Sequence, residues 1–149
     1  MRAVIQRVSS ASVEAGGEKI AEIGKGFLIL LGAGVDDEPA DASYLVDKIS
    51  GLRIFEDPDG KLNLSIRETG GAALVVAQFT LYGDARRGLR PSFAGAAPAE
   101  AASRLVSGFV TGLRAAGIGT KTGVFGANMK VMLVNEGPVT ILLDSRKAF

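Results

Sequence analysis

Residues 27–51 read FLILLGAGVDDEPADASYLVDKISG, and the spacing of the apolar side chains changes half-way along this stretch. The unbroken apolar run 27–31 is typical of a strand that is covered on both faces. Further on, apolar residues recur every three or four positions, which places them on one face of a helix. These positions are Ala42, Leu45, Val46 and Ile49. Two aspartates at 36–37 precede this helix as candidate caps, Pro39 suits its first turn, and Gly51 suits its end.

The rest of the chain shows the same two patterns. Paired glycines at 16–17 indicate a hairpin turn, Asp57–Gly60 reads as a turn, and residues 83–97, which carry Gly, Arg, Pro and Ala, read as a long surface loop. Pro98 opens a second helix that ends at Gly117. Strands are predicted at 2–8, 11–14, 19–23, 27–31, 52–56, 74–79, 118–124, 129–135 and 139–144. The sequence therefore predicts one α/β domain over residues 1–149, a mixed sheet with two main helices packed on it.

Composition narrows the possible chemistry. The 149-residue chain has a formal net charge of +1, which excludes a histone-like polycation but permits local basic patches. It contains no Cys and no His. Thiolate nucleophiles, Cys-ligated metals and Ser-His-Asp triads are therefore excluded. Catalysis must rely on carboxylates, Lys, Tyr, hydroxyls, backbone amides or the substrate itself, and we expect no metal and no cofactor.

Nothing in the sequence predicts a membrane segment. The longest apolar run, 27–31, is far shorter than the ~20 residues that a spanning helix needs. The apolar start of the chain is interrupted by Gln6 and Arg7, so it does not read as a signal peptide. We therefore expect a cytoplasmic protein.

Two short segments allow both a structural and a functional interpretation. A buried strand ends at Gln78, Phe79 and Thr80. These residues are either the solvent-exposed end of the core, or they form a pocket whose backbone amides stabilise an oxyanion. Thr80 has no His to activate its hydroxyl. Gly137 and Pro138 lie between two predicted strands. They form either an ordinary tight turn or, if the peptide bond is cis, a functional feature.

A third candidate is the loop that follows the Gln78–Thr80 segment. Arg86, Arg87 and Arg90 gather there, close to Phe93. Such a group either forms a solvated surface or contacts a phosphate backbone. The length of the loop favours a functional role.

Four segments together resemble one family. They are MRAVIQRV at 1–8, AQFTL at 77–81, RPSF at 90–93 and NEGPVT at 135–140. In these segments, and in the order of its predicted elements from end to end, the chain resembles the D-aminoacyl-tRNA deacylases, also called D-tyrosyl-tRNA deacylases. One departure is that Ala77 stands where the family usually has Ser, so no hydroxyl role is assigned there.

The resemblance implies a deacylase fold with barrel-like sheet layers, and a homodimer with two active sites at the subunit interface. It implies that Gly137-Pro138 is cis and reaches into the partner's pocket, where its carbonyls exclude an L side chain, and that Arg7 holds this motif. Residues 78–80 would be catalytic, mainly through backbone amides, together with the 2′-hydroxyl of the tRNA. The implied substrates are tRNAs charged with a D-amino acid or glycine, in a proofreading step of translation, and Arg86, Arg87 and Arg90 are the candidate tRNA contacts.

Two other functions remain open at this point. The first is a non-catalytic tRNA-binding module, against which the small net charge argues. The second is an editing enzyme for small L-aminoacyl-tRNA, in whose family the Gly-Pro bond is trans. Phe79, the middle residue of the Gln-Phe-Thr segment, favours the D-specific type.

Overall fold

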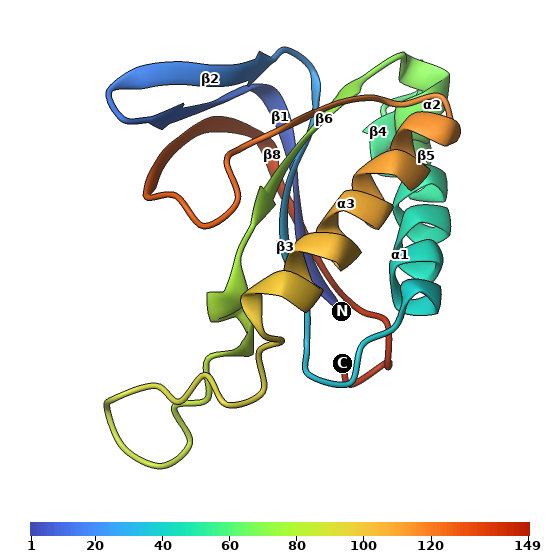
Figure 1. Cartoon of the computed structure of the whole chain (residues 1–149). Coiled ribbons are helices and arrows are strands. Elements are labelled where there is room, and N and C mark those ends of the chain that lie inside the picture. Colours follow the sequence, from blue (N-terminus) through green and yellow to red (C-terminus); the bar gives the residue numbers. More distant parts are fainter.

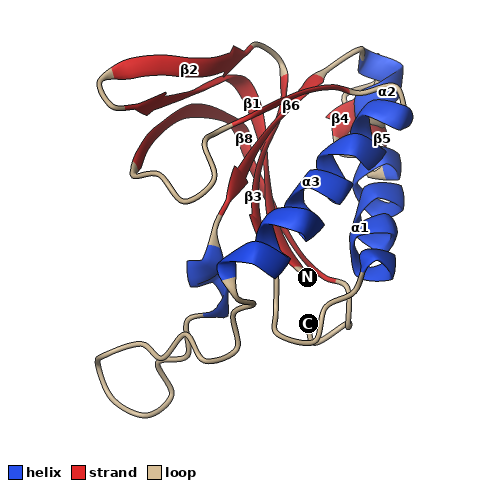
Figure 2. Ribbon diagram, in the orientation of Figure 1, coloured by secondary structure: helices blue, strands red, loops and turns tan.

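A six-stranded mixed sheet forms the centre of the structure, and the two long helices lie side by side on one of its faces (Figures 1 and 2). The computed structural model describes residues 1–149. The sheet strands are β1 (Arg2–Ala15), β2 (Glu18–Ile23), β3 (Gly26–Gly32), β6 (Ala72–Ala77), β7 (Gly119–Thr122) and β8 (Met129–Asp144). The predicted α/β class, with two main helices, is confirmed. No helix combines the length and the apolar character that crossing a membrane would require.

Strand β1 organises the sheet because it pairs with three other strands. The strand order is β2-β1-β3-β6-β7, and β8 pairs with the other edge of β1. The β1 pairs are antiparallel, whereas β3, β6 and β7 run parallel to one another. Residues 2–8 of β1 face β3, and residues 11–15 face β2. The strands predicted at 2–8 and 11–14 are therefore one strand, which turns into β2 at Gly16 and Gly17.

Apolar side chains pack on both faces of β3, as the continuous run 27–31 predicts. Phe27, Ile29 and Leu31 lie in the core beneath the helices, whereas Leu28 belongs to a second core on the opposite face. This split follows from the alternation of side chains along a strand. The side chains of strand β6 are divided between the two cores in the same way, and those at 73–76 are all buried.

The long helix α1 (Pro39–Gly51) buries its predicted apolar face, and the second long helix, α3 (Ala99–Ala115), buries Leu105, Phe109, Val110 and Leu113. Prediction of the α1 cap was wrong, because Glu38 is the N-cap residue and forms a capping box with Asp41. The two helices approach closely at Gly112, where an added Cβ would lie 2.8 Å from Cγ2 of Val46.

Several boundaries differ from the prediction. Strand β4 (Phe55–Glu56) is only the end of the predicted strand 52–56, and it pairs with an unpredicted β5 (Leu62–Leu64). A short helix α2 (Ile66–Thr69) follows, capped by Ser65 and Glu68. Strand β6 ends at Ala77, and the next residues form the 3₁₀ turn η1 (Phe79–Tyr82). Strand β7 is shorter than the predicted strand 118–124, and residues 129–144 form the single strand β8 instead of two strands.

Candidate active site

The segment Gln78–Thr80 turns the end of β6 into η1. The Gln78 amide donates a 2.8 Å hydrogen bond to the Leu31 carbonyl, which keeps the segment aligned with β3. The Gln78 side-chain amide donates to the Thr80 hydroxyl. The amides of Phe79 and Thr80 are the first of the 3₁₀ turn, and such N–H groups have no partner within the helix. Two backbone donors are therefore available at this strand end.

Contacts from distant parts of the chain fix the far end of η1. The Tyr82 hydroxyl donates a 3.0 Å hydrogen bond to Asp37 Oδ2, and Arg2 Nη1 donates a 3.0 Å hydrogen bond to the Leu81 carbonyl. The Arg2 guanidinium also lies 4.5 Å from the centre of the Tyr82 ring. The turn that carries the free amides is thus held by both the N-terminal strand and the segment before α1.

Asp37 is the electrostatic centre of these contacts. Its side chain is only 2% exposed, and its carboxylate lies 2.8 Å from the Met1 ammonium and 3.1 Å from Arg146 Nε. Burial alone would raise the pKa of Asp37, but the hydrogen bonds from the ammonium, from the Gly34 amide and from Arg146 lower it below its usual value. Burial and the nearby Asp37 carboxylate raise the pKa of Tyr82 far above its usual value, so the phenol stays protonated as a donor.

A cavity of about 550 Å³ opens beside Gln78 and Phe79. Most of its wall is apolar, and much of that wall consists of alanine side chains, which leave room for a ligand. The lining residues are Leu31, Ala33, Val76, Ala77, Gln78, Phe79, Phe93, Ala96, Ala97, Ala99, Ala102, Val106, Phe125, Gly126, Ala127, Asn128, Met129 and Val131. Phe79 is 57% exposed at this mouth and packs edge-on against Phe93, with ring centres 5.1 Å apart.

Gly137 and Pro138 lie in a four-residue excursion of β8. Thr140 pairs with Gln6 and Asn135 pairs with Val8, so residues 136–139 stand opposite the single residue Arg7. The peptide bond between Gly137 and Pro138 is cis. The predicted turn between two strands is thus a local bulge within one continuous strand.

The side chains of Asn135 and Arg7 hold this excursion in place through hydrogen bonds to its backbone. Asn135 Oδ1 accepts a 2.8 Å hydrogen bond from the Val139 amide, and its Nδ2 donates a 3.1 Å hydrogen bond to the Val139 carbonyl. Buried Arg7 donates from Nε to the Glu136 carbonyl at 2.9 Å and from Nη1 to the Ile54 carbonyl at 2.7 Å. A Cβ on Gly137 would lie 3.0 Å from Arg7 Nη2, so the support leaves no space for a side chain.

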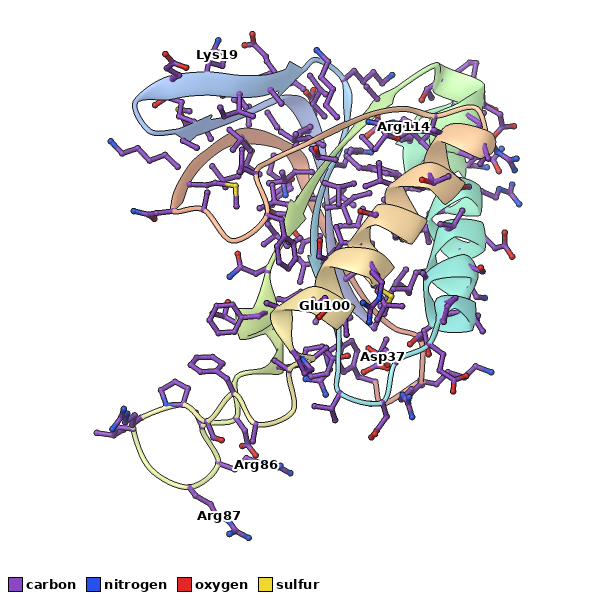
Figure 3. The ribbon with its side chains drawn as sticks, in the orientation of Figure 1. Lys19, Asp37, Arg86, Arg87, Glu100 and Arg114 are labelled. Atoms are coloured by element: carbon purple, nitrogen blue, oxygen red, sulfur yellow. The ribbon has the colours of Figure 1, made fainter.

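The basic loop after η1 extends away from the body of the molecule (Figures 1 and 3). Arg86 is paired with Asp84 at 2.6 Å, and this ion pair lowers the pKa of Asp84. Arg87 and Arg90 are exposed and form no ion pair. Leu89, between them, is fully exposed.

The structure therefore separates the sequence-predicted residues into three places. Gln78 and Phe79 line the large cavity and Thr80 follows them in the turn, Gly137 and Pro138 lie over Arg7, and the arginines lie on the projecting loop. None of residues 136–139 lines the cavity of their own chain. Sequence reasoning assigned no role to Asn135 or to the contact between Asp37 and Tyr82. The sequence holds no signal for the latter, since the two residues lie 45 positions apart and meet only in the fold.

Comparisons with known proteins point to one family. The family model described as D-Tyr-tRNA(Tyr) deacylase matches residues 4–144. A D-aminoacyl-tRNA deacylase of Syntrophobacter fumaroxidans is 56% identical over 149 residues, which is 100% of both chains. A similarly named protein of Koribacter versatilis is 57% identical over the same length.

Solved structures agree in fold. A protein described as the c-Myc DNA unwinding element binding protein has a TM-score of 0.90 and 41% sequence identity, covering 97% of this chain and 98% of its own. A structure described as a probable eukaryotic D-amino acid tRNA deacylase has a TM-score of 0.82 at 17% identity, covering 95% of this chain and 97% of its own, and shows the fold alone.

Proposed function

The chain belongs to the D-Tyr-tRNA(Tyr) deacylase family, and from that premise we propose that it hydrolyses D-aminoacyl-tRNA at the segment Gln78–Thr80. The observation that carries this assignment is the pair of free backbone amides of Phe79 and Thr80, because Phe79 lines the large cavity and Thr80 is the next residue of the same turn. The reaction splits the ester between the amino acid and the terminal ribose, and it releases free amino acid and tRNA.

The available groups suit this ester hydrolysis. Water adds to the ester carbonyl, and the amides of Phe79 and Thr80 donate to the oxygen as it becomes negative. The bond to the ribose oxygen then breaks, and that oxygen takes the proton. One such donor typically lowers the barrier by about 3 kcal/mol. An aminoacyl ester is already reactive, so amides together with the 2′-hydroxyl of the ribose suffice without a histidine.

The cavity beside these amides receives the 3′ end of the substrate. Its volume of about 550 Å³ lies in the range of pockets for small ligands. Apolar walls suit the flat faces of a nucleobase, and the few polar groups, among them Gln78 and Asn128, orient it. The aminoacyl group then points towards the turn η1.

We also infer a homodimer in which β8 forms the interface. This strand pairs only with β1, so its other edge is free. The strand also carries exposed apolar side chains on either side of residues 136–139: Met132, Val134 and Leu142, which are 41%, 57% and 57% exposed. A long free edge with apolar side chains is a favourable surface for association with another chain. Because Gly137 and Pro138 do not line their own cavity, they act on a substrate only in the pocket of a partner subunit.

Chiral selection in this arrangement depends on the backbone. The carbonyls of Gly137 and Pro138, held by Arg7 and Asn135, form a wall at the side of the aminoacyl group where an L side chain would lie. Such a wall rejects the wrong substrate by steric clash instead of binding the right one more tightly. Glycine has no side chain to clash, so glycyl-tRNA is also a substrate. Arg87 and Arg90, the unpaired cations of the loop, contact the tRNA backbone, and Arg86 does so less because Asp84 neutralises it.

The test is deacylation of D-Tyr-tRNA, L-Tyr-tRNA and Gly-tRNA by the purified protein with a chelator present. We expect rapid loss of the D-tyrosyl and glycyl esters, with the L-tyrosyl ester spared. Equal loss of both tyrosyl esters would contradict the backbone wall. Binding of a folded dimer to all three without turnover would instead favour a tRNA-binding module.

A further inference from the structure

A second cleft continues the large cavity along α3. Its volume is about 260 Å³, and it lies between α3, the end of β6 and the segment after β7. The two spaces share Ala77, Val106 and Phe125 in their walls, so they adjoin each other. The other lining residues of the cleft are Val75, Ser103, Ser107, Val110, Thr111, Arg114, Thr122 and Gly123. The first cavity is largely apolar, whereas this cleft carries hydroxyls and a cation.

The hydroxyl groups form a row along one face of α3. Ser103, Ser107 and Thr111 are spaced by four residues, which brings them above one another on a helix. Neither these three nor Thr122 across the cleft makes a side-chain hydrogen bond, whereas Thr120, two residues before Thr122, is bonded to the Ile118 carbonyl. The row therefore offers unengaged donors to a ligand.

Arg114 closes the far end of the row. Its Nε and Nη2 donate to the Thr120 carbonyl at 3.2 and 3.0 Å, which fixes the guanidinium and leaves Nη1 without a protein partner. No carboxylate lines the cleft. Glu100, the acidic residue in the first turn of α3, lies at the opposite end of the helix from Arg114 (Figure 3). It forms an ion pair with Arg104 at 2.6 Å.

We propose that this cleft binds the phosphate–ribose backbone of the nucleotides that precede the terminal adenosine of the substrate. This inference rests on the proposed function, which places that adenosine in the adjoining cavity. From Ser103 to Arg114 the helix rises about 16 Å, at 1.5 Å per residue. Stacked nucleotides of one strand rise about 3.4 Å each. The row is thus long enough for more than one nucleotide, with the hydroxyls on ribose and phosphate oxygens and Arg114 on a phosphate.

Two substrates distinguish binding in this cleft from binding at the catalytic site. The D-tyrosyl ester of adenosine has no preceding phosphate, whereas the D-tyrosyl ester of the trinucleotide CpCpA has two. Ser107→Asp places a negative charge in the middle of the row at an exposed position. We expect it to raise KM for the trinucleotide ester about tenfold without changing kcat, and to leave both constants for the adenosine ester within twofold of the original.

The matched control is Ser43→Asp, which adds the same charge at an exposed position on α1 and leaves KM for both esters unchanged. In a second measurement, Arg114→Gln raises KM for the trinucleotide ester and makes its dependence on salt shallower, by about 0.7 in log KM against log salt. If Ser107→Asp changes both esters equally, or changes neither, the cleft does not bind the backbone. If the unmodified protein cleaves neither ester nor D-Tyr-tRNA, the proposed function itself fails.

Discussion

Replacing Arg7 by Met tests whether a buried cation holds the Gly137-Pro138 excursion in place. Met keeps much of the apolar stem of Arg7 but removes the hydrogen bonds to the Glu136 and Ile54 carbonyls, at 2.9 and 2.7 Å. Hydrogen bonds from a charged group contribute about 1.5–3 kcal/mol each. The ion pair with Glu56 adds little, because its charges are 3.9 Å apart and the Glu56 side chain is 60% exposed.

Two such bonds give an expected loss of about 3 kcal/mol in the free energy of unfolding, since water replaces part of what is lost. In a chain of this size, 1 kcal/mol corresponds to about 2–4 °C in Tm. Arg7→Met should therefore lower Tm by about 6–12 °C. The amides of residues 136–139 should also exchange faster with deuterium than in the unmodified protein, at a temperature where both are folded.

Function should change in a specific direction. If the proposed wall loosens, hydrolysis of L-Tyr-tRNA should rise by about tenfold while hydrolysis of D-Tyr-tRNA falls, as measured on the folded protein. The control is Arg53→Met, which removes one exposed hydrogen bond to the Asn63 carbonyl and should change neither Tm nor selectivity. If Arg7→Met has the Tm and the D/L ratio of that control, Arg7 does not support the excursion.

Four further perturbations follow from the structure. Thr80→Ala should keep kcat for D-Tyr-tRNA within about threefold, because the donor that we propose for the oxyanion is the backbone amide and not the hydroxyl; a fall of a hundredfold in a folded protein would refute this. Gly112→Ala places a Cβ 2.8 Å from Val46 Cγ2, and such overpacking should cost about 1–3 kcal/mol in thermal unfolding without changing kcat. Val134→Lys on the free edge of β8 should give monomers in sedimentation and abolish deacylation, whereas an active monomer would exclude a shared site. Asp37→Asn should lower the free energy of urea unfolding at pH 7. Because the folded-state pKa of Asp37 lies below its ordinary value of 3.8, that contribution is present above 3.8 and is lost as the pH falls through the lowered pKa, so the stabilities of the two proteins should converge as the pH falls below it.

The elements that the sequence predicts well are those with a local cause. The run 27–31 is buried on both faces, and the face of α1 is set by residues three and four apart, so neighbours in sequence decide both. Strand β8 shows where such reasoning fails. Glycine and proline at 137–138 indicate an interruption, but the ladder with β1 continues on either side of it with partners more than 110 residues away.

The candidate site shows the same limit. The segments at 78–80 and 135–140 could be recognised from their residues, because the chain resembles a known family there. The cavity could not, since its wall consists of alanines and other apolar residues whose types mark no function. The unengaged hydroxyls of α3 likewise become visible only when the fold shows which serines have partners.

In β8, the four residues 136–139 stand opposite the single residue Arg7, so this segment is an insert in the strand whose length can change. Residues 129–135 and 140–144 keep their own pairing with β1, and only Arg7 stands opposite the insert. A residue added between 136 and 139 would lengthen the protruding tip and leave both ladders in register. A residue added elsewhere in β8 would turn every following side chain to the other face of the sheet. The shape of this tip can therefore diverge among related chains while the sheet beneath it stays constant.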